Sequence, residues 1–217
     1  MVRIVPFAVF IAFVMAGALL PATPAVLRIW DIRQVFTIRA VVVMLLIAVF
    51  WRDYSELHDP VQPPREITLA VLAGLLVFFI WISLDQPWAT LGQTPQFDPT
   101  RADGSMDWTL VAFRILGLAA VVPVMEELFW RSYLLRRIQQ LDFLALDPHT
   151  VGLRANLICA ALFASEHSQW LAGLIAGLVY NCIYVRTRNL WMPIISHATT
   201  NAALGCWILA TKQWQFW

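Results

Sequence analysis

The chain has 217 residues, of which 60% are hydrophobic and only 13% are charged. A soluble domain usually carries about 25% charged residues, so this composition leaves too little polar surface to face water. The formal net charge of +1 excludes a strongly basic face for nucleic acid. Cys159, Cys182 and Cys206 lie in apolar stretches without metal-ligand spacing, which favours small core residues over a disulfide framework. We therefore expect one integral membrane domain over residues 1–217.

Seven apolar segments follow one another along the chain. A helix needs roughly 20 apolar residues to cross the hydrocarbon core, at about 1.5 Å per residue. The sequence therefore predicts an all-α fold, a polytopic transmembrane bundle of about seven helices within a range of six to eight. The fifth segment is short and is expected to extend toward Pro148. In chain order the predicted spans are Ile4–Leu20, Phe36–Trp51, Ile67–Leu84, Trp108–Leu135, Ala155–Glu166, Trp170–Val185 and Leu190–Thr211.

One stretch between the spans has the composition of a soluble loop. Asp85–Asp107 is rich in Pro, Asp, Gly and Thr. This loop divides the chain into N-terminal spans at 1–107 and a segment at 108–205 that carries the unusual polar residues described below. We find no internal repeat.

Basic residues outside the spans predict the orientation, because cytoplasmic loops carry more arginine and lysine than loops on the other side. The count favours one side by nine residues to five, which would place the N-terminus in the cytoplasm and the C-terminus outside. The nine are Arg3, Arg52, Arg65, Arg131, Arg136, Arg137, Arg154, Arg186 and Arg188, and the five are Arg28, Arg33, Arg39, Arg101 and Lys212.

The fourth span carries two glutamates inside an apolar run. A charge inside a bilayer is costly, so such residues are functional candidates by default. Glu127 and Arg131 are four residues apart with the acid first, the favourable order for an ion pair on a helix. Glu126 lies about 100° away around the helix and has no local partner, which suits a general base. Pro123 removes a helix hydrogen bond just before it and is expected to open space beside Glu126.

Three further polar residues lie on the fifth and seventh spans. His167 ends one apolar segment, while His197 and Asn201 are four residues apart and share one helix face. Counted from the nearest arginine on the same side, Glu126, His167 and His197 lie at depths of about 15, 20 and 14 Å, at 1.5 Å per residue. We therefore expect these three residues to surround one intramembrane pocket that opens to the cytoplasm.

These side chains are sufficient for the hydrolysis of a peptide bond. Glu126 can take a proton from water, and His167 can help to hold and polarise that water. His197 and Asn201 can donate hydrogen bonds to the oxyanion of a tetrahedral intermediate. No Ser or Cys is placed as a nucleophile beside a base, so water is the expected attacking species. Glu126, His167 and His197 could instead hold a divalent metal such as Zn²⁺, and the residues alone do not separate the two schemes.

Taken together, the three motifs resemble those of the CPBP family, the CAAX-protease and bacteriocin-processing intramembrane proteases, also called Abi. The family pattern is EExxxR, then FxxxH, then HxxxN or HxxxD. This chain has Glu126-Glu127-Leu-Phe-Trp-Arg131, Phe163-Ala-Ser-Glu-His167 and His197-Ala-Thr-Thr-Asn201, in that order. Each motif is weak alone, but the ordered set is specific, and it covers about residues 108–205.

The resemblance implies a role for each residue in an intramembrane endopeptidase. Glu126 matches the catalytic glutamate and His167 the second water-activating residue. Both metal-dependent and metal-free mechanisms are argued for the family, and we favour the metal-free one, with no cofactor required. The remaining matches are the oxyanion-stabilising pair His197 and Asn201 and the supporting acid and base Glu127 and Arg131.

The chain is also similar to a bacterial group of CAAX prenyl protease-related proteins associated with exosortase-type protein sorting, whose substrates need not be prenylated. The resemblance implies a bacterial plasma membrane and a peptide or protein substrate, with or without a lipid modification, and no nucleic acid. One departure is Arg188-Asn189, where many members have Thr-Gly. Asn189 is expected to adopt the left-handed turn that glycine favours.

Two other function classes are compatible with intramembrane Glu and His residues. One is a non-proteolytic scaffold or immunity protein that keeps the fold and binds a partner. The other is a proton-coupled carrier, which is disfavoured because the chain shows no inverted repeat and no paired broken helices.

Several residues near the motifs are expected to have structural roles. The Glu127–Arg131 pair is expected to stabilise its helix, and Gly173 and Gly177 to let two helices pack closely. Glu166 is expected to face away from His167 toward the far interface. Arg114 is expected to extend to the outer surface of the membrane.

Overall fold

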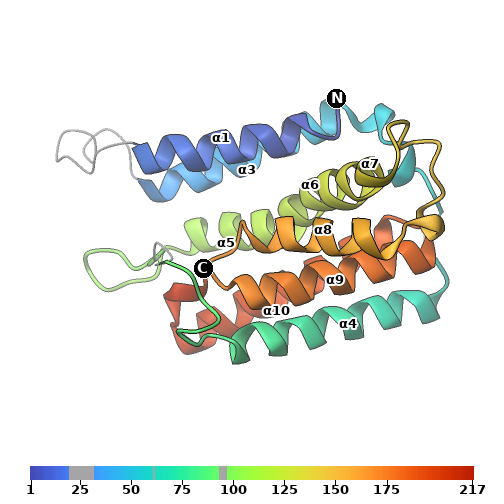
Figure 1. Ribbon diagram of the computed structural model, residues 1–217. Helices are drawn as coiled ribbons and strands as arrows, with labels where there is room; N and C mark the ends of the chain where they lie inside the picture. Colours follow the sequence, from blue (N-terminus) through green and yellow to red (C-terminus); the bar gives the residue numbers. More distant parts are fainter. Residues whose placement is uncertain (20–31, 61, 93–96) are drawn as a thin grey trace.

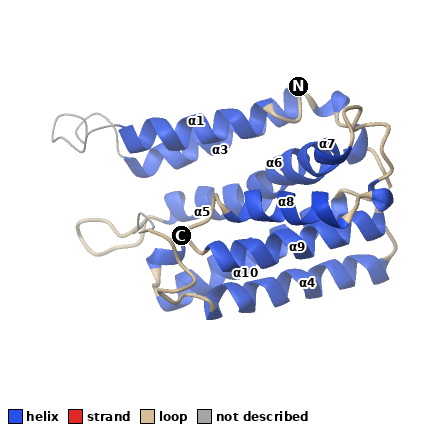
Figure 2. Ribbon diagram, in the orientation of Figure 1, coloured by secondary structure: helices blue, strands red, loops and turns tan. Residues whose placement is uncertain are grey.

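The computed structural model describes residues 1–19, 32–60, 62–92 and 97–217. Within these residues the chain forms a bundle of seven helices, with α1 and α3 paired at one side and α4 at the other (Figure 1). The described part contains no β-strand, only an isolated bridge between Thr100 and Met106 (Figure 2). The prediction of an all-α bundle of about seven helices is confirmed.

The helices follow the predicted spans to within a few residues. One boundary was wrong, because the fifth helix does not extend to Pro148. Pro148–Thr150 forms a separate 3₁₀ turn, and Gly152 before the helix is extended. The helices are α1 (Val5–Leu19), α3 (Ile32–Val49), α4 (Pro64–Ser83), a composite helix over Trp108–Gln139, α8 (Leu153–Ala164), α9 (Trp170–Thr187) and α10 (Trp191–Thr211).

Three of these helices are both long and apolar enough to cross a membrane, namely α4, the composite helix and α9. The apolar parts of α1, α3 and α8 are shorter, at Val5–Gly17, Val35–Val49 and Leu153–Ala164. The seventh helix, α10, has 21 residues, but its middle carries polar side chains, several of which are buried inside the bundle. The three long apolar helices indicate an integral membrane protein. Helix α10 carries polar side chains that face the inside of the bundle.

Two π segments interrupt the α-helical hydrogen bonding of the composite helix. It consists of α5 (Trp108–Leu116), a π segment, α6 (Val122–Glu127), a second π segment and α7 (Arg136–Gln139). The π segments cover Gly117–Val121 and Leu128–Leu135. The two glutamates of the fourth predicted span therefore lie on a short α segment between two widened turns, and π segments often accompany functional sites.

Glycines set the distance between neighbouring helices. A side chain at Gly74 of α4 would collide with the Ser196 carbonyl oxygen of α10. On α9, a methyl group at Gly177 would meet Ala160 at 3.1 Å, and one at Gly173 would meet Ala164 at 3.2 Å. The predicted close packing at Gly173 and Gly177 is therefore confirmed.

A buried ion cluster closes one end of the bundle, which we call the N-terminal end because Met1 lies there (Figure 1). Arg3 and Arg136 both bind the Glu56 carboxylate, at 2.6 and 2.5 Å. The Ser132 hydroxyl also donates to this carboxylate. Burial by itself would raise the pKa of Glu56, but hydrogen bonds from Arg3 and Ser132 and the charge of Arg3 outweigh it and lower the pKa to about 2. The cluster ties the N-terminus to the composite helix.

Two sequence expectations are corrected at this end. Arg3, Arg131 and Arg136 were counted as charges of the loops, but all three are buried and ion-paired within the bundle. The predicted orientation therefore rests on a smaller excess of exposed arginines. The left-handed residue after α9 is Arg188, with φ of 55°, and not Asn189. Asn189 instead uses its side chain, which accepts from the Trp191 amide at 3.0 Å.

Candidate active site

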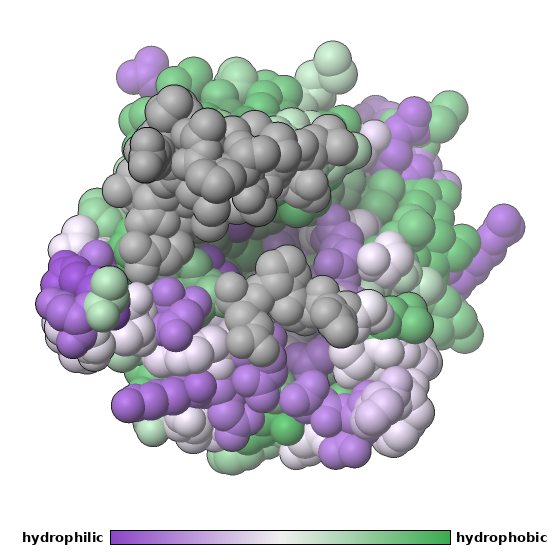
Figure 3. Space-filling view, turned by 90° about the vertical axis from the view of Figure 1, so that its left-hand side faces the viewer, coloured by the Kyte–Doolittle hydropathy of each residue, from purple (hydrophilic) through white to green (hydrophobic). Residues whose placement is uncertain are grey.

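A cavity of about 310 Å³ lies inside the bundle, and Glu126, His167, His197 and Asn201 all line it. Its lining reaches Trp217 at the end opposite to Met1, which we call the C-terminal end. Figure 3 views this end and shows hydrophilic surface within a hollow. The pocket expected around the three motifs is present, but it extends away from the arginine-rich N-terminal end on which it was expected to open. The ion cluster around Glu56 fills that other end.

A chain of polar contacts connects the composite helix with α10. The Arg131 guanidinium donates to Glu127 Oε1 at 3.1 Å, and both side chains are completely buried. His197 Nδ1 lies 2.8 Å from the same Oε1 atom. On the other side of the ring, His197 Nε2 lies 4.0 Å from Glu126 Oε2. His197 is thus held between the two adjacent glutamates of the EExxxR motif.

The contacts of His197 define which nitrogen is available. A carboxylate can only accept, so Nδ1 carries the hydrogen that is donated to Glu127. The Tyr180 ring stacks on the imidazole at a centroid distance of 4.9 Å, and the Tyr180 hydroxyl donates to Thr200 at 2.8 Å. Glu126 Oε2 is buried and has no hydrogen-bond partner in the described structure. His197 Nε2 and Glu126 Oε2 are therefore left free to meet a substrate or water.

His167 is fixed by its own helix end. Its Nδ1 donates to the Phe163 carbonyl oxygen at 2.9 Å, which leaves Nε2 as the acceptor nitrogen. The Trp81 ring meets the imidazole edge-on at 5.3 Å. A side chain at Gly173 would approach His167 Nδ1 to 3.3 Å, so this glycine makes room for the imidazole as well as for α8. The FxxxH spacing thus places donor and acceptor one helical turn apart.

Asn201 is positioned by the proline of the composite helix. In the π segment the Val122 N–H donates to the Gly117 carbonyl, five residues back. The N–H of the next residue would therefore donate to the Leu118 carbonyl. That residue is Pro123, which has no N–H. The Asn201 amide donates to the Leu118 carbonyl instead, at 2.8 Å. One N–H of the amide is thereby committed and the other is left for a ligand in the cavity.

The comparison with known families agrees with this geometry. Residues 108–203 match the family model described as Type II CAAX prenyl endopeptidase Rce1-like. These residues form a CAAX-protease-family domain. No curated protein and no solved structure gives a match to the chain.

The CAAX-protease-family domain begins at the first residue of the composite helix and ends within α10. It includes all three motifs, while α1, α3 and α4 lie outside the match. The match to an endopeptidase family indicates a peptidase, and the long apolar helices indicate that it lies in a membrane. The roles of Glu126, His167, His197 and Asn201 within it remain predictions.

The structure adds contacts that sequence reasoning missed. Glu127 and Arg131 form the predicted ion pair, yet Glu127 also binds His197 and so orients a candidate catalytic residue. Tyr180 and Trp81 pack against the two histidines, and neither belongs to a recognisable motif. One sequence feature indicates that this side of α9 lies inward. Tyr180 is three residues after Gly177, which packs against α8, so the two residues lie on neighbouring faces of the helix.

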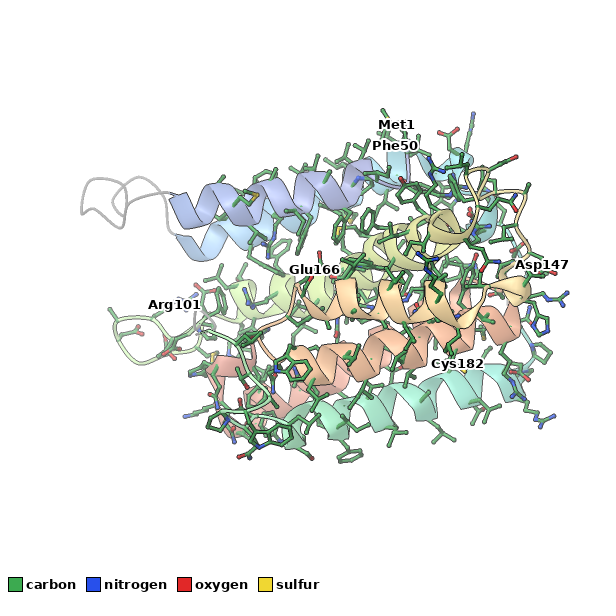
Figure 4. All side chains as sticks on the ribbon, in the orientation of Figure 1. Met1, Phe50, Arg101, Asp147, Glu166 and Cys182 are labelled. Atoms are coloured by element: carbon green, nitrogen blue, oxygen red, sulfur yellow. The ribbon has the colours of Figure 1, made fainter. Side chains whose placement is uncertain are left out.

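Glu166 was expected to face away from His167, toward the far interface. It is exposed, as expected, but it also contributes to the lining of the cavity that His167 lines (Figure 4 labels Glu166). The helix was expected to continue to Glu166, whereas it ends at Ala164 and both residues lie in the segment that follows.

Arg114 was also misplaced by the sequence. It does not extend to the outer surface but lines the cavity. Its guanidinium lies 4.1 Å from the centre of the Phe97 ring and 4.4 Å from that of Phe36. The reason is the packing of α3 against α5, which covers this part of the helix with aromatic side chains.

The metal-binding alternative needs ligands that meet around one ion. Among the described residues, no three His, Cys, Asp or Glu side chains lie close enough together to hold a metal ion. Glu126 and His197 approach each other to 4.0 Å, and the Nε2 atoms of His197 and His167 are the ring nitrogens left for a ligand, because Nδ1 of each ring is bonded to Glu127 or to a backbone carbonyl. The chemistry derived below uses protein groups and water alone.

Proposed function

We propose that this chain hydrolyses a peptide bond of a membrane-associated or lipid-modified substrate, with water activated by Glu126. The observation that carries the proposal is the buried chain from Arg131 through Glu127 and His197 to Glu126, at the wall of one cavity. It offers an unpartnered carboxylate oxygen beside an oriented imidazole. The apolar and aromatic walls of the cavity suit an apolar peptide or a lipid chain.

In the proposed reaction, Glu126 and His167 activate the water that attacks the peptide bond. The Glu126 carboxylate accepts a proton from water, and the water oxygen forms a bond to the peptide carbonyl carbon. His167 accepts a hydrogen bond from the same water through Nε2. Glu126 then returns the proton to the leaving nitrogen as the C–N bond breaks.

The oxyanion of the intermediate needs hydrogen-bond donors. The free N–H of the Asn201 amide is one, and a doubly protonated His197 supplies the other through Nε2. Glu127 stabilises that imidazolium by accepting from Nδ1. With Arg131 and His197 positive and the two glutamates negative, the buried group carries no net charge, which limits its cost in a medium of low dielectric.

We also propose that the N-terminal end faces the cytoplasm of a bacterium, because exposed or half-exposed arginines are still more frequent there. The cavity would then open toward the outer half of the plasma membrane. A C-terminal alkaline phosphatase fusion should be active and a C-terminal green fluorescent protein fusion dark. The reverse result would place the cavity on the cytoplasmic side.

Terminal-peptide proteomics tests the proposed activity in cells. Membranes from cells that express the wild type or Glu126→Ala are compared, with Glu66→Ala on α4, away from the cavity, as a matched control. New protein ends that appear with the wild type and with Glu66→Ala, but not with Glu126→Ala, would support proteolysis and identify the substrate class. Identical ends in all three, with equal expression, would favour a non-proteolytic scaffold.

A further inference from the structure

Two arginines outside the catalytic motifs line the part of the cavity nearer to its C-terminal end. Arg39 of α3 lies 4.1 Å from the centre of the Phe10 ring and 4.8 Å from that of Phe36. Arg114 of α5 lies over the same Phe36 ring at 4.4 Å. The two guanidinium carbons are therefore no more than about 9 Å apart, although Arg39 and Arg114 are 75 positions apart in the sequence.

Among the described residues, neither arginine has an opposite charge to balance it. In the part of the chain that the structure describes, no ion pair joins Arg39 or Arg114 to a carboxylate, and the Nε atoms of both are buried without a hydrogen-bond partner. The fully buried arginines of the described chain, Arg3, Arg131 and Arg136, are each paired with a glutamate. Two unpaired cations inside a membrane are costly, and aromatic faces offset only part of that cost.

The chemistry of the pair indicates an anion. Arginine presents a planar fork of N–H donors that matches a carboxylate or phosphate, and two forks together can surround one such group. Arg39 and Arg114 line the same continuous cavity as Glu126. A ligand that reaches the candidate catalytic carboxylate can therefore also reach the arginines.

The distance between the two sites fits a short peptide. Arg114 and Glu126 are twelve residues apart on the composite helix, which is about 18 Å along the axis at about 1.5 Å per residue. At about 3.3 Å per residue of extended peptide, this distance corresponds to roughly five residues.

We propose that Arg39 and Arg114 form an anion-binding subsite that holds a carboxylate of the peptide substrate, roughly five residues from the bond that is cleaved. The proposal rests on the proposed endopeptidase function for its ligand, and it defines a specificity that the catalytic motifs do not contain. Arg39 lies outside the segment that matches the family model. The subsite thus joins the N-terminal helices to the CAAX-protease-family domain.

The experiment measures binding, so it does not depend on turnover. The protein carries Glu126→Gln and is purified in detergent. The probes are two fluorescein-labelled hexapeptides of alternating Leu and Ala, one with a free C-terminal carboxylate and one with a carboxamide. Fluorescence anisotropy gives the dissociation constant of each peptide for three proteins. These are the protein with both native arginines, the double variant Arg39→Gln/Arg114→Gln, and Arg101→Gln. Arg101 is a matched control because it lies at the same end of the bundle but is half-exposed and paired with Asp107.

The carboxylate peptide should bind at least about tenfold more tightly than the amide when both arginines are present. The double variant should lose this difference by weakening the carboxylate peptide alone, while Arg101→Gln should keep it. Thermal unfolding should show no loss of stability in the double variant, because two unpaired cations are removed. If the double variant does not fold, Arg39→Gln and Arg114→Gln singly should each weaken carboxylate binding by about threefold or more.

Equal binding of the two peptides by the protein with both arginines would overturn the subsite, as would a preference that survives in the double variant. Phosphatidylglycerol that copurifies only when the arginines are present, without discrimination between the peptides, would assign the pair to a lipid headgroup and would also overturn it. Failure of the proposed function looks different, since the wild type would then cut no substrate although the binding difference could persist.

Discussion

The composite helix contributes residues to two buried clusters of arginine and glutamate, one around Glu56 and one around Glu127. In the first, Glu56 receives Arg3, Arg136 and Ser132, so both carboxylate oxygens are engaged. In the second, Arg131 and His197 share Glu127, while the adjacent Glu126 keeps an oxygen without a partner. The same residue types thus serve two purposes. A saturated carboxylate fixes the architecture, and an unsaturated one beside an imidazole is available for proton transfer.

Replacing the unsaturated carboxylate should have the largest effect on activity. Glu126→Gln should lower kcat by at least about 100-fold, the range for loss of a general base. Stability should fall less than in Glu127→Gln, because Glu126 Oε2 has no hydrogen bond to lose and only its charge beside His197 is removed. Kinetics on the substrate found by proteomics, with thermal unfolding in the same detergent, measure both effects. A correctly folded variant with substantial turnover would show that Glu126 is not the base.

Glu127→Gln should lower both stability and activity, because this residue belongs to an ion pair and also orients His197. Leaving Arg131 buried without its acid should cost roughly 3–5 kcal/mol of stability. The loss of the negative charge behind His197 should lower kcat by roughly 10–100-fold, as for other groups that orient an imidazole. If activity per folded molecule is unchanged, Glu127 is purely structural.

Glu56→Gln should separate architecture from chemistry. Arg3 and Arg136 would lose their shared acid, with a stability loss of roughly 3–5 kcal/mol. Activity per folded molecule should remain within about twofold of the wild type, since the cluster lies at the end of the bundle opposite to the cavity opening. Denaturant titration and kinetics below the unfolding temperature test this. A large fall in kcat of the folded variant would contradict the division between the two clusters.

The stability conferred by Glu56 should also depend on pH. Its folded-state pKa of about 2 lies below the ordinary value of 4.5, so the contribution is complete above about pH 4.5 and is lost as the pH falls toward 2. The shift corresponds to about 3 kcal/mol. The stability difference between the wild type and Glu56→Gln should be constant from pH 7 to 5 and shrink below that. A difference that is independent of pH down to 3 would contradict the depressed pKa.

Metal removal should have the smallest effect. Because no group of three metal ligands is found among the described residues, exhaustive chelation should leave activity within about twofold. Elemental analysis of the purified protein should find no stoichiometric Zn²⁺. Activity that is lost on chelation and restored by Zn²⁺ would replace the metal-free mechanism with a metal-dependent one.

Local rules predicted most of the fold. Apolar length and charge content located the seven helices, and the spacing of Glu127 and Arg131 predicted their ion pair. Helix depth predicted that Glu126, His167 and His197 meet at one pocket. Errors arose where a helix end or a packing contact decides the outcome. Glu166 is exposed yet contributes to the cavity lining after α8 ends early, and Arg114 stays inside because α3 covers it.

The sequence by itself determined that the chain is a helical membrane protein and which polar side chains are costly enough to require a purpose. Those properties depend on composition and on residues within one or two helical turns. Only the tertiary structure decided the rest, namely which glutamate holds His197, which amide serves the carbonyl that Pro123 leaves free, toward which end the cavity extends, and that Arg39 meets Arg114. Each of these is a contact between helices distant in the chain, where side-chain packing and the pairing of buried charges, and not local spacing, set the lowest free energy.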